Sequence, residues 1–458
     1  MVLGQSSVVE LVKDVLWPAW ESQRAHLDWI DGWYRWTPDP VSLPKKSTPE
    51  HRYLAGLSDQ PWLNLVVTTS AQCMYVDVIR SSADVAGDVD LSGPGPWRTW
   101  MANRFDRRQA ALYRAALAYG IAYNKVLPGQ DERTGESMPV MRGVSPRRML
   151  ALYRDPAEDD WPEYTIEVGR KGTDGRRLVE VMDFEATYRV SVDEINRVEF
   201  IDYVQHDVGV TPVVRYCNML DLDGRTPGEV EPFIKPAARI NKSGYDRMLT
   251  QHHSSWKIRT VSGMAEPDTE EEANRKKLQL RQDDLLVAED PDTKFGTLDE
   301  TPLGGFIDAW RADIEALAAL SQTPTHALTG QLINLSAEAL AAARAGLTQK
   351  VAERQKSFGS SHVQALQLAA AIEGDEASAR DVRMRVSWED MEIRSMAQAV
   401  DALGKASQML GVPPQALWGR IPGVEKSDVD EWSAMARSAD PTASMLSRLE
   451  SQFGLEDS

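Results

Sequence analysis

Acidic and histidine side chains are the groups in this 458-residue chain that could perform chemistry, but they complete no catalytic or metal-binding pattern. The stretch DVDLSG at 88–93 begins like a calcium-binding loop, yet its twelfth position is Thr99, where a bidentate Glu is required. The acidic loop at 155–160 could hold Mg²⁺, but no second acidic motif supports a two-metal site. We interpret both stretches as solvated turns.

His252 and His253 are neighbours on an expected helix and point to different sides of it, which is poor chelating geometry. The two cysteines, Cys73 and Cys217, form no metal-binding spacing, and we expect buried thiols in a reducing compartment. The P-loop, GxGxxG, HExxH and GxSxG patterns are absent from the sequence. We therefore predict no catalytic residue, no metal and no cofactor, and a protein that is not an enzyme.

The charge balance restricts the partners of the chain. Lys and Arg number 51 and Asp and Glu number 69, so the formal net charge is −18. A general nucleic-acid binder neutralises phosphates with cations, so this balance argues against that class. It does not exclude a protein that surrounds DNA without holding it tightly. No window of 18 apolar residues occurs, and the first 20 residues lack a signal-peptide pattern, so we expect no membrane contact.

The elements that must position these residues form an α+β chain that is mainly helical. Apolar spacing predicts helices at 6–36, 97–124, 233–256, 304–321 and 336–372. Alternating residues predict a β-rich block at 138–217 with a hairpin turn at Asp174-Gly175. The apolar run at 61–81 fits either a buried strand or a buried helix. A strand at 382–388, short helices and a loose tail at 439–458 follow.

Tryptophan is concentrated near the start of the chain. Six of the 14 tryptophans lie in the first 62 residues, and Trp29, Trp33 and Trp36 fall on one face of the first expected helix. We interpret this aromatic face as core packing or a subunit contact rather than as a platform that stacks a ligand.

Three stretches stand out by their charge. The helix at 233–256 is basic, and its cations are Lys235, Arg239, Lys242 and Arg247. The stretch 270–277 is expected to be exposed and contains Glu270, Glu271, Glu272, Arg275, Lys276 and Lys277. The segment 322–335 contains no Lys, Arg, Asp or Glu, and its polar side chains are Thr323, Thr325, His326, Thr329, Gln331 and Asn334. The alternative to a functional role is a solvated surface for 270–277 and a plain turn between two helices for 322–335.

Four stretches resemble, in their order and spacing, the portal proteins of long-tailed phages that infect Gram-positive, including actinobacterial, hosts. NLVVTTSAQCMYVDVI at 64–79 is similar to the segment that begins the family's wing. The stretch 97–126 is similar to the long wing helix with its ending ALAYGIAYNKV. The stretch 209–249 contains the strand PVVRYCN and a following helix, and 310–359 contains a helix, the loop TPTHALTG and the SAEAL helix.

The resemblance implies the portal fold, assembled as a ring of usually twelve subunits around a central channel for double-stranded DNA. Its implied parts are a wing (1–232), a first stem helix (233–256), a clip (257–303), a second stem helix (304–321), a tunnel loop (322–335), a long wing helix with a returning wing strand (336–400) and a crown (401–438). It also implies that the four stem cations face the channel, that the uncharged tunnel loop narrows it, and that the 270–277 surface docks partners.

The implied partners are the terminase large subunit, the head–tail adaptor, the major capsid and scaffolding proteins, and DNA that passes without sequence specificity. The protein would be assembled in the host cytoplasm and would reside at the portal vertex of the virion. A portal catalyses nothing, since the separate terminase is the motor, and this agrees with the missing catalytic motifs.

Two other hypotheses stay open. The apolar spacing of Leu340, Leu347, Val351 and Phe358 allows a coiled-coil contact in a helical structural or adaptor protein of the virion that is not a portal. An enzyme whose catalytic residues form no motif is the second. The β-containing unit at 257–303 favours a portal over a coiled-coil adaptor, which has no reason to carry it.

Overall fold

The computed structural model describes residues 2–35, 37–43, 45–82, 95–131, 134–254, 259–262, 294–297, 301–330, 337–389, 396–421, 424 and 426–439. The chain divides into two compact units. Unit 1 comprises Met1–Ala25, Ser70–Pro227 and Gln349–Ser458, and unit 2 comprises His26–Thr69 and Gly228–Thr348. Helices and strands both contribute, which confirms the predicted α+β class.

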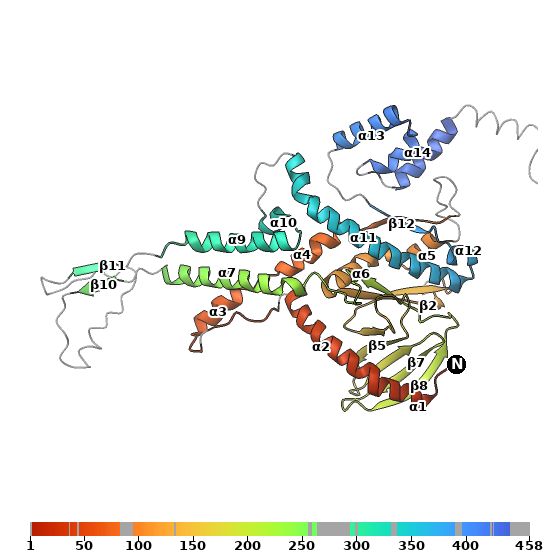
Figure 1. Ribbon diagram of the computed structural model, residues 1–458, viewed down its shortest axis with the longest axis horizontal. Helices are drawn as coiled ribbons and strands as arrows, with labels where there is room; N and C mark the ends of the chain where they lie inside the picture. The colour runs from red at the N-terminus through yellow and green to blue at the C-terminus, as the bar shows by residue number, and fades with distance from the viewer. Residues whose placement is uncertain are drawn as a thin grey trace, which may run out of the picture. The chain divides into compact units, whose positions relative to one another are not determined.

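The largest sheet in the described part of unit 1 has five antiparallel strands (Figure 1). In spatial order they are β4 (Met149–Leu152), β5 (Tyr164–Lys171), β6 (Arg177–Met182), β7 (Ala186–Val192) and β8 (Val198–Gln205). Burial alternates along β7, as expected for a strand with one face in the core. The turn after β5 includes Gly175 at φ 82°, a left-handed conformation that glycine adopts readily. The predicted β-rich block and its hairpin are confirmed.

The N-terminal helical segment packs against this sheet. It consists of α1 (Gln5–Leu11), a π-helical turn (Val12–Leu16) and α2 (Trp17–Tyr34). Its buried residues recur every four positions, as Val8, Val12, Leu16 and Trp20. A regular α-helix would rotate such a series by about 40° per step, and the wider π turn offsets part of this drift. The predicted helix is confirmed, but the π turn was not predicted.

A second sheet of unit 1 has the order β3 (Ser137–Val144), β2 (Ile121–Gln130) and β9 (Val213–Cys217). Two helices, α5 (Pro96–Ala102) and α6 (Phe105–Tyr119), precede it in the chain. The single helix predicted at 97–124 is therefore wrong in two places. Arg104 at φ 54° separates α5 from α6. Gly120 at φ 90° then ends α6, and the chain continues as β2.

The apolar run at 61–81 contains both elements that its sequence allowed. It begins with α4 (Trp62–Ala71) and ends with β1 (Val76–Arg80). Strand β1 pairs antiparallel with β12 (Arg385–Trp388), which lies inside the strand predicted at 382–388. The long helix predicted at 336–372 is confirmed as α11 (Ala337–Glu373). The remaining described helices of unit 1 are α12 (Glu376–Ala379), α13 (Met396–Leu410), a 3₁₀ helix (Pro414–Arg420) and α14 (Lys426–Ala439).

An aromatic core in unit 1 surrounds His362 of α11, whose side chain is fully buried. The rings that contact it belong to Trp100, Phe105, Tyr113, Tyr216 and Trp388. The Tyr113 hydroxyl donates to Gln109, so it accepts from His362 Nε2 at 2.6 Å. The Tyr216 hydroxyl donates to His362 Nδ1 at 2.8 Å. Burial lowers the pKa of His362 to about 3, so the imidazole is neutral at pH 7.

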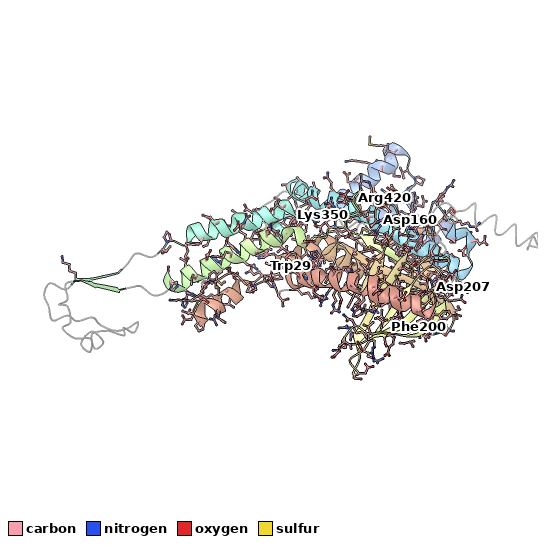
Figure 2. The ribbon with its side chains drawn as sticks, turned by 60° about the horizontal axis from the view of Figure 1, so that its bottom comes forward. Trp29, Asp160, Phe200, Asp207, Lys350 and Arg420 are labelled. Carbon is pink, nitrogen blue, oxygen red and sulfur yellow. The ribbon has the colours of Figure 1, made fainter. Side chains whose placement is uncertain are left out.

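Unit 2 is mainly helical in the part that the structure describes. Besides the end of α2 and the starts of α4 and α11, it contains α3 (Pro49–Ser58), a 3₁₀ turn (Glu231–Phe233), α7 (Ile234–Ser254), α9 (Gly304–Leu320) and α10 (Thr325–Thr329). Strands β10 (Arg259–Ser262) and β11 (Lys294–Thr297) form an antiparallel pair. Helices α7 and α9 lie side by side in both views (Figure 1, Figure 2) and confirm the helices predicted at 233–256 and 304–321.

Two of the three tryptophans on the predicted aromatic face share one hydrogen-bond acceptor. The indole N–H groups of Trp29 and Trp33 donate to Asp39 Oδ2 at 3.0 and 3.2 Å. Trp33 is buried, whereas Trp29, labelled in Figure 2, is 42% exposed. Trp36 lies outside the described residues. The packing role that we expected is thus confirmed for Trp33.

Candidate functional site

The α7–α9 helix pair displays the basic stretch that the sequence singled out. Helix α7 buries one face, which consists of Ile234, Ala237, Ile240, Asn241, Gly244 and Tyr245. The exposed side carries Lys235, Arg239 and Lys242 at spacings of four and three, followed four residues later by Asp246. We call these four residues the α7 stripe. A chain of net negative charge therefore places a row of cations on one side of one helix.

Asp313 of α9 joins the two helices through both oxygens of its carboxylate. Its Oδ1 accepts from Arg239 Nε at 2.8 Å, and its Oδ2 accepts from Ser243 Oγ at 2.6 Å. Arg239 and Ser243 are four residues apart, so one carboxylate on the neighbouring helix reaches both. The Asp313 side chain is 18% exposed and that of Arg239 is 57% exposed. The acid is thus held at the edge of the α7 stripe and the cation remains at the surface.

Trp310, one turn before Asp313, packs against α7. The Arg247 guanidinium lies over its indole ring, 4.8 Å from the centroid, which is the geometry of a cation–π contact. Trp62 of α4 meets the same ring edge-on at 6.2 Å. Arg247 therefore contributes to the packing of α7 against α9. Along α7, Arg239 precedes Arg247. Along α9, the partner of Arg247 (Trp310) precedes the partner of Arg239 (Asp313), so the two helices run antiparallel.

The segment after α9 turns sharply before it forms α10. The Thr323 N–H donates to the Ala318 carbonyl at 3.0 Å, and Gln322 adopts φ 53°. Pro324 precedes the single helical turn of α10, which Gly330 ends at φ 68°. The loop predicted at 322–335 is therefore wrong for 325–329, since the proline fixes a backbone conformation from which a helical turn can begin.

A cavity of about 540 Å³ opens beside this segment. Its lining includes Arg311 and Glu315 from α9, His326 and Thr329 from α10, and Gly346 from α11. The single cation and single anion of this lining lie four residues apart on one helix, so their charges balance locally. The segment therefore borders a surface without excess positive charge.

Comparison with known proteins identifies the family to which this arrangement belongs. Residues 13–442 match the family described as "Phage portal protein, SPP1 Gp6-like". The chain belongs to this family of phage portal proteins. The portal protein of Mycobacterium phage L5 is 24% identical over a 353-residue alignment that covers 72% of this chain and 71% of the relative. The portal protein of Mycobacterium phage D29 is 25% identical over 359 residues, with the same two shares. The resemblance to actinobacterial phage portals is thereby confirmed.

The four cations predicted for the stem of this portal chain occupy different surroundings. Arg239 pairs with Asp313, Lys242 pairs with Asp246 on its own helix, and Arg247 contacts Trp310. Lys235 is exposed and forms no ion pair with any described residue. Three of the four cations therefore have a partner within the subunit.

The structure describes four of the six polar residues predicted for the tunnel loop of the portal, and it brings them together around α10. Thr323 is buried, with the Ser321 hydroxyl 2.9 Å away as a donor. Thr325 is exposed, and His326 and Thr329 are half-buried. Gln331 and Asn334 lie outside the described residues. In this conformation Thr323 is not displayed at the surface, in contrast to Thr325.

The predicted clip surface lies outside the described residues. It consists of Glu270, Glu271, Glu272, Arg275, Lys276 and Lys277. Strand β10 precedes this stretch in the chain and strand β11 follows it, and the two strands pair with each other.

Within the described ranges, His, Cys, Asp and Glu side chains nowhere gather in a group of three or more that could hold a metal ion. The carboxylates of the 155–160 loop cap their own turn instead: Asp159 Oδ2 accepts from the Asp155 N–H at 2.7 Å, and Asp155 Oδ1 accepts from the Ala157 N–H at 3.0 Å. None of the described helices combines the length and apolar character that crossing a bilayer requires.

The contacts that Asp313 and Trp310 make with α7 were not predicted, because apolar spacing marked Trp310 only as part of one face of the helix at 304–321. Neither residue stands out by type on this helix, which also contains the acids Asp308 and Glu315 and the aromatic residue Phe306. Their partners on α7 lie more than 60 residues away, at Arg239, Ser243 and Arg247. Spacing along one helix cannot reveal a contact that depends on how two helices pack.

Proposed function

We propose that the chain forms a closed ring at one vertex of a phage capsid, through which double-stranded DNA is packaged and later ejected. Membership of the portal family over residues 13–442 supports this role. The observation that carries the channel assignment is the α7–α9 pair, two antiparallel helices with exposed cations that are largely compensated inside the subunit. Binding to DNA strengthens with each phosphate that a protein cation neutralises. Cations that already have a partner in the subunit neutralise fewer phosphates, so DNA can pass this surface closely.

The parts of the portal fold follow from this assignment. We place the wing in 1–232, the stem helices in 233–256 and 304–321, and the clip in 257–303. The tunnel loop is 322–335, the long wing helix and returning strand are 336–400, and the crown is 401–438. The boundaries of α7 and α9 support the stem helices, and the pairing of β1 with β12 supports a strand that returns to the wing after the long helix.

The tunnel loop narrows the channel sterically rather than by binding. It has no Lys, Arg, Asp or Glu, and the neighbouring cavity is balanced in charge. The hydroxyls of Thr325 and Thr329 and the imidazole of His326 provide weak hydrogen bonds only, so DNA can move past them.

The partners follow from the chemistry that the chain lacks. With no nucleotide-binding motif in the sequence, the subunit is not the motor and is not an enzyme, so the terminase large subunit must dock on the ring and drive the DNA. We assign this docking, and the later docking of the head–tail adaptor, to the clip surface at 270–277. Capsid and scaffolding proteins surround the ring when it is built into the head, which we expect to occur in the host cytoplasm.

Complementation tests the proposed function directly. A portal-null actinobacterial phage supplied with this chain should produce filled heads, and the purified full-length chain should run as one large species of about twelve subunits in light scattering. A stable monomer across micromolar concentrations would contradict the proposal.

The tunnel-loop assignment is tested by adding charge. The double substitution Thr329→Arg/Gln331→Arg places two cations per subunit in the segment and should slow packaging in a salt-sensitive way. The control Gln205→Arg/Gln415→Arg adds the same charge at exposed positions on β8 and in the C-terminal helices. Equal packaging rates for the two variants would remove the assignment.

The clip assignment is tested by charge reversal. Glu270→Lys, Glu271→Lys and Glu272→Lys together should leave the ring intact but impair packaging or tail joining. Reversal of the exposed wing acids Glu158 and Asp160 is the control. A wild-type phage yield from the triple variant would show that 270–277 is only a solvated surface.

A further inference from the structure

We propose that Asp313 and Asp246 are built-in counterions that occupy Arg239 and Lys242 and so prevent these cations from binding the phosphates of passing DNA. The inference rests on the proposed channel position of the α7 stripe. The two acids thereby control how strongly the stem contacts DNA.

Asp313 is suited to this role because it cannot easily leave Arg239. Both of its oxygens are engaged on α7, one by the Arg239 guanidinium at 2.8 Å and the other by the Ser243 hydroxyl at 2.6 Å. Its side chain is mostly covered, so it has little freedom to rotate into solvent. A phosphate approaching Arg239 therefore meets a cation that already has a fixed anion beside it.

Asp246 does the same for Lys242 from within α7. The two side chains form an ion pair four residues apart, and the Lys242 ammonium also lies 5.3 Å from the centroid of the Tyr245 ring. With both acids in place, each subunit presents three cations and two acids along this side of the stem. Only Lys235 is left without a counterion among the described residues.

The alternative is that Asp313 only fastens α9 to α7. Exposed and half-exposed ion pairs contribute little to stability, so loss of this pair should leave the fold intact. If fastening is the only role of Asp313, its replacement should not change DNA binding. Ser243→Ala distinguishes the two roles, because it removes one of the two interhelical bonds of Asp313 and changes no charge. Asp313→Asn keeps the shape of the side chain and removes its charge.

The test measures how purified full-length rings bind a short fluorescent DNA duplex between 50 and 200 mM salt. Asp313→Asn should increase binding at 50 mM salt and steepen its loss with salt, since each additional phosphate contact makes that loss about 3.5-fold larger over this range. Asp246→Asn should act in the same direction. The matched control is Asp308→Asn, which removes the same charge from an exposed position of α9 that has no ion pair with a described residue.

Two further variants test whether the effect of Asp313 on DNA binding depends on its charge and on Arg239. Arg239→Gln/Asp313→Asn should return binding and its salt dependence to wild-type values, and Ser243→Ala should leave both unchanged. The inference is overturned if Asp313→Asn binds DNA like Asp308→Asn, or if Ser243→Ala binds like Asp313→Asn. In either case the proposed portal function stands as long as wild-type rings form and complement the portal-null phage. A wild-type chain that forms no ring overturns both.

Discussion

The aromatic core around His362 in unit 1 and the α7–α9 pair in unit 2 satisfy their polar groups in opposite ways. In the core, burial keeps the His362 imidazole neutral and holds its pKa far below the ordinary value for histidine, and two tyrosine hydroxyls satisfy its ring nitrogens. In the helix pair, charged side chains remain at the surface and are balanced by carboxylates.

The difference follows from desolvation. A charge inside the core would lose its hydration without recovering it, so neutral hydrogen bonds are favoured there. At the surface, water stabilises both members of an ion pair, and the pair contributes little to folding. The core therefore contributes mainly to stability, and the α7 stripe contributes mainly to the charge displayed along the α7–α9 pair.

Removal of a core ring should produce the largest effect. Phe358 is fully buried and stacks on Tyr113 with ring centroids 5.2 Å apart. Phe358→Ala should lower the free energy of unfolding of this region by about 3–5 kcal/mol, because it leaves a cavity. Hydrogen exchange in peptides from α6 and α11 measures the change. Phe184→Ala, at a half-exposed position, should cost less than about 0.5 kcal/mol, and equal losses for both variants would break the comparison.

Acid should weaken the same core. The unfolded chain binds a proton at His362 near pH 6.5, whereas the folded core binds it only near pH 3. Between these values the unfolded state takes up more protons, so stability is lost as the pH falls, by about 2 kcal/mol at pH 5. Exchange of the α11 amides measured from pH 7 to 5 should show this loss. His362→Gln should remove that part of the pH dependence, and an unchanged slope would contradict the assignment.

A smaller loss of stability is expected in unit 2 when the hydrogen-bond acceptor shared by two indole N–H groups is removed. Asp39→Ala removes the acceptor of Trp29 and Trp33 and should destabilise the end of α2 by about 1 kcal/mol. Asp39→Asn keeps an acceptor oxygen and should lose less. Tryptophan fluorescence and exchange of the α2 amides report the change, and identical values for the two variants would argue against the shared hydrogen bonds.

The smallest effect on stability is expected in the α7 stripe. Lys242→Gln breaks an exposed ion pair between residues one turn apart and should change the free energy of unfolding by no more than about 0.5 kcal/mol. Exchange of the α7 amides provides the measurement. A loss as large as that of Phe358→Ala would mean that the stripe supports the fold rather than the surface charge.

The sequence predicted most elements whose periodicity is local. The helices at 233–256, 304–321 and 336–372, the β-rich block and the turn at Gly175 were all found from spacing and turn residues. The helix predicted at 97–124 failed where single residues, Arg104 and Gly120, take left-handed backbone conformations. Only Gly120 gave a warning in the sequence, because an arginine rarely adopts φ above zero.

The candidate site was predicted less completely than the fold. The basic row on α7 and the local acid Asp246 follow from helical spacing, but the compensation of Arg239 does not, because Asp313 reaches α7 only through packing of two helices distant in sequence. The same holds for His362: its partners come from α6 and β9, and nothing near it in the sequence indicates that it is buried and neutral.

Electron cryomicroscopy of the purified full-length chain tests the central claim most directly. We expect a closed ring of about twelve subunits in which α7 lines the channel and the α7 stripe, with Arg239 paired to Asp313, faces its axis. A monomer, or a ring in which Lys235, Arg239 and Lys242 point away from the channel, would contradict it.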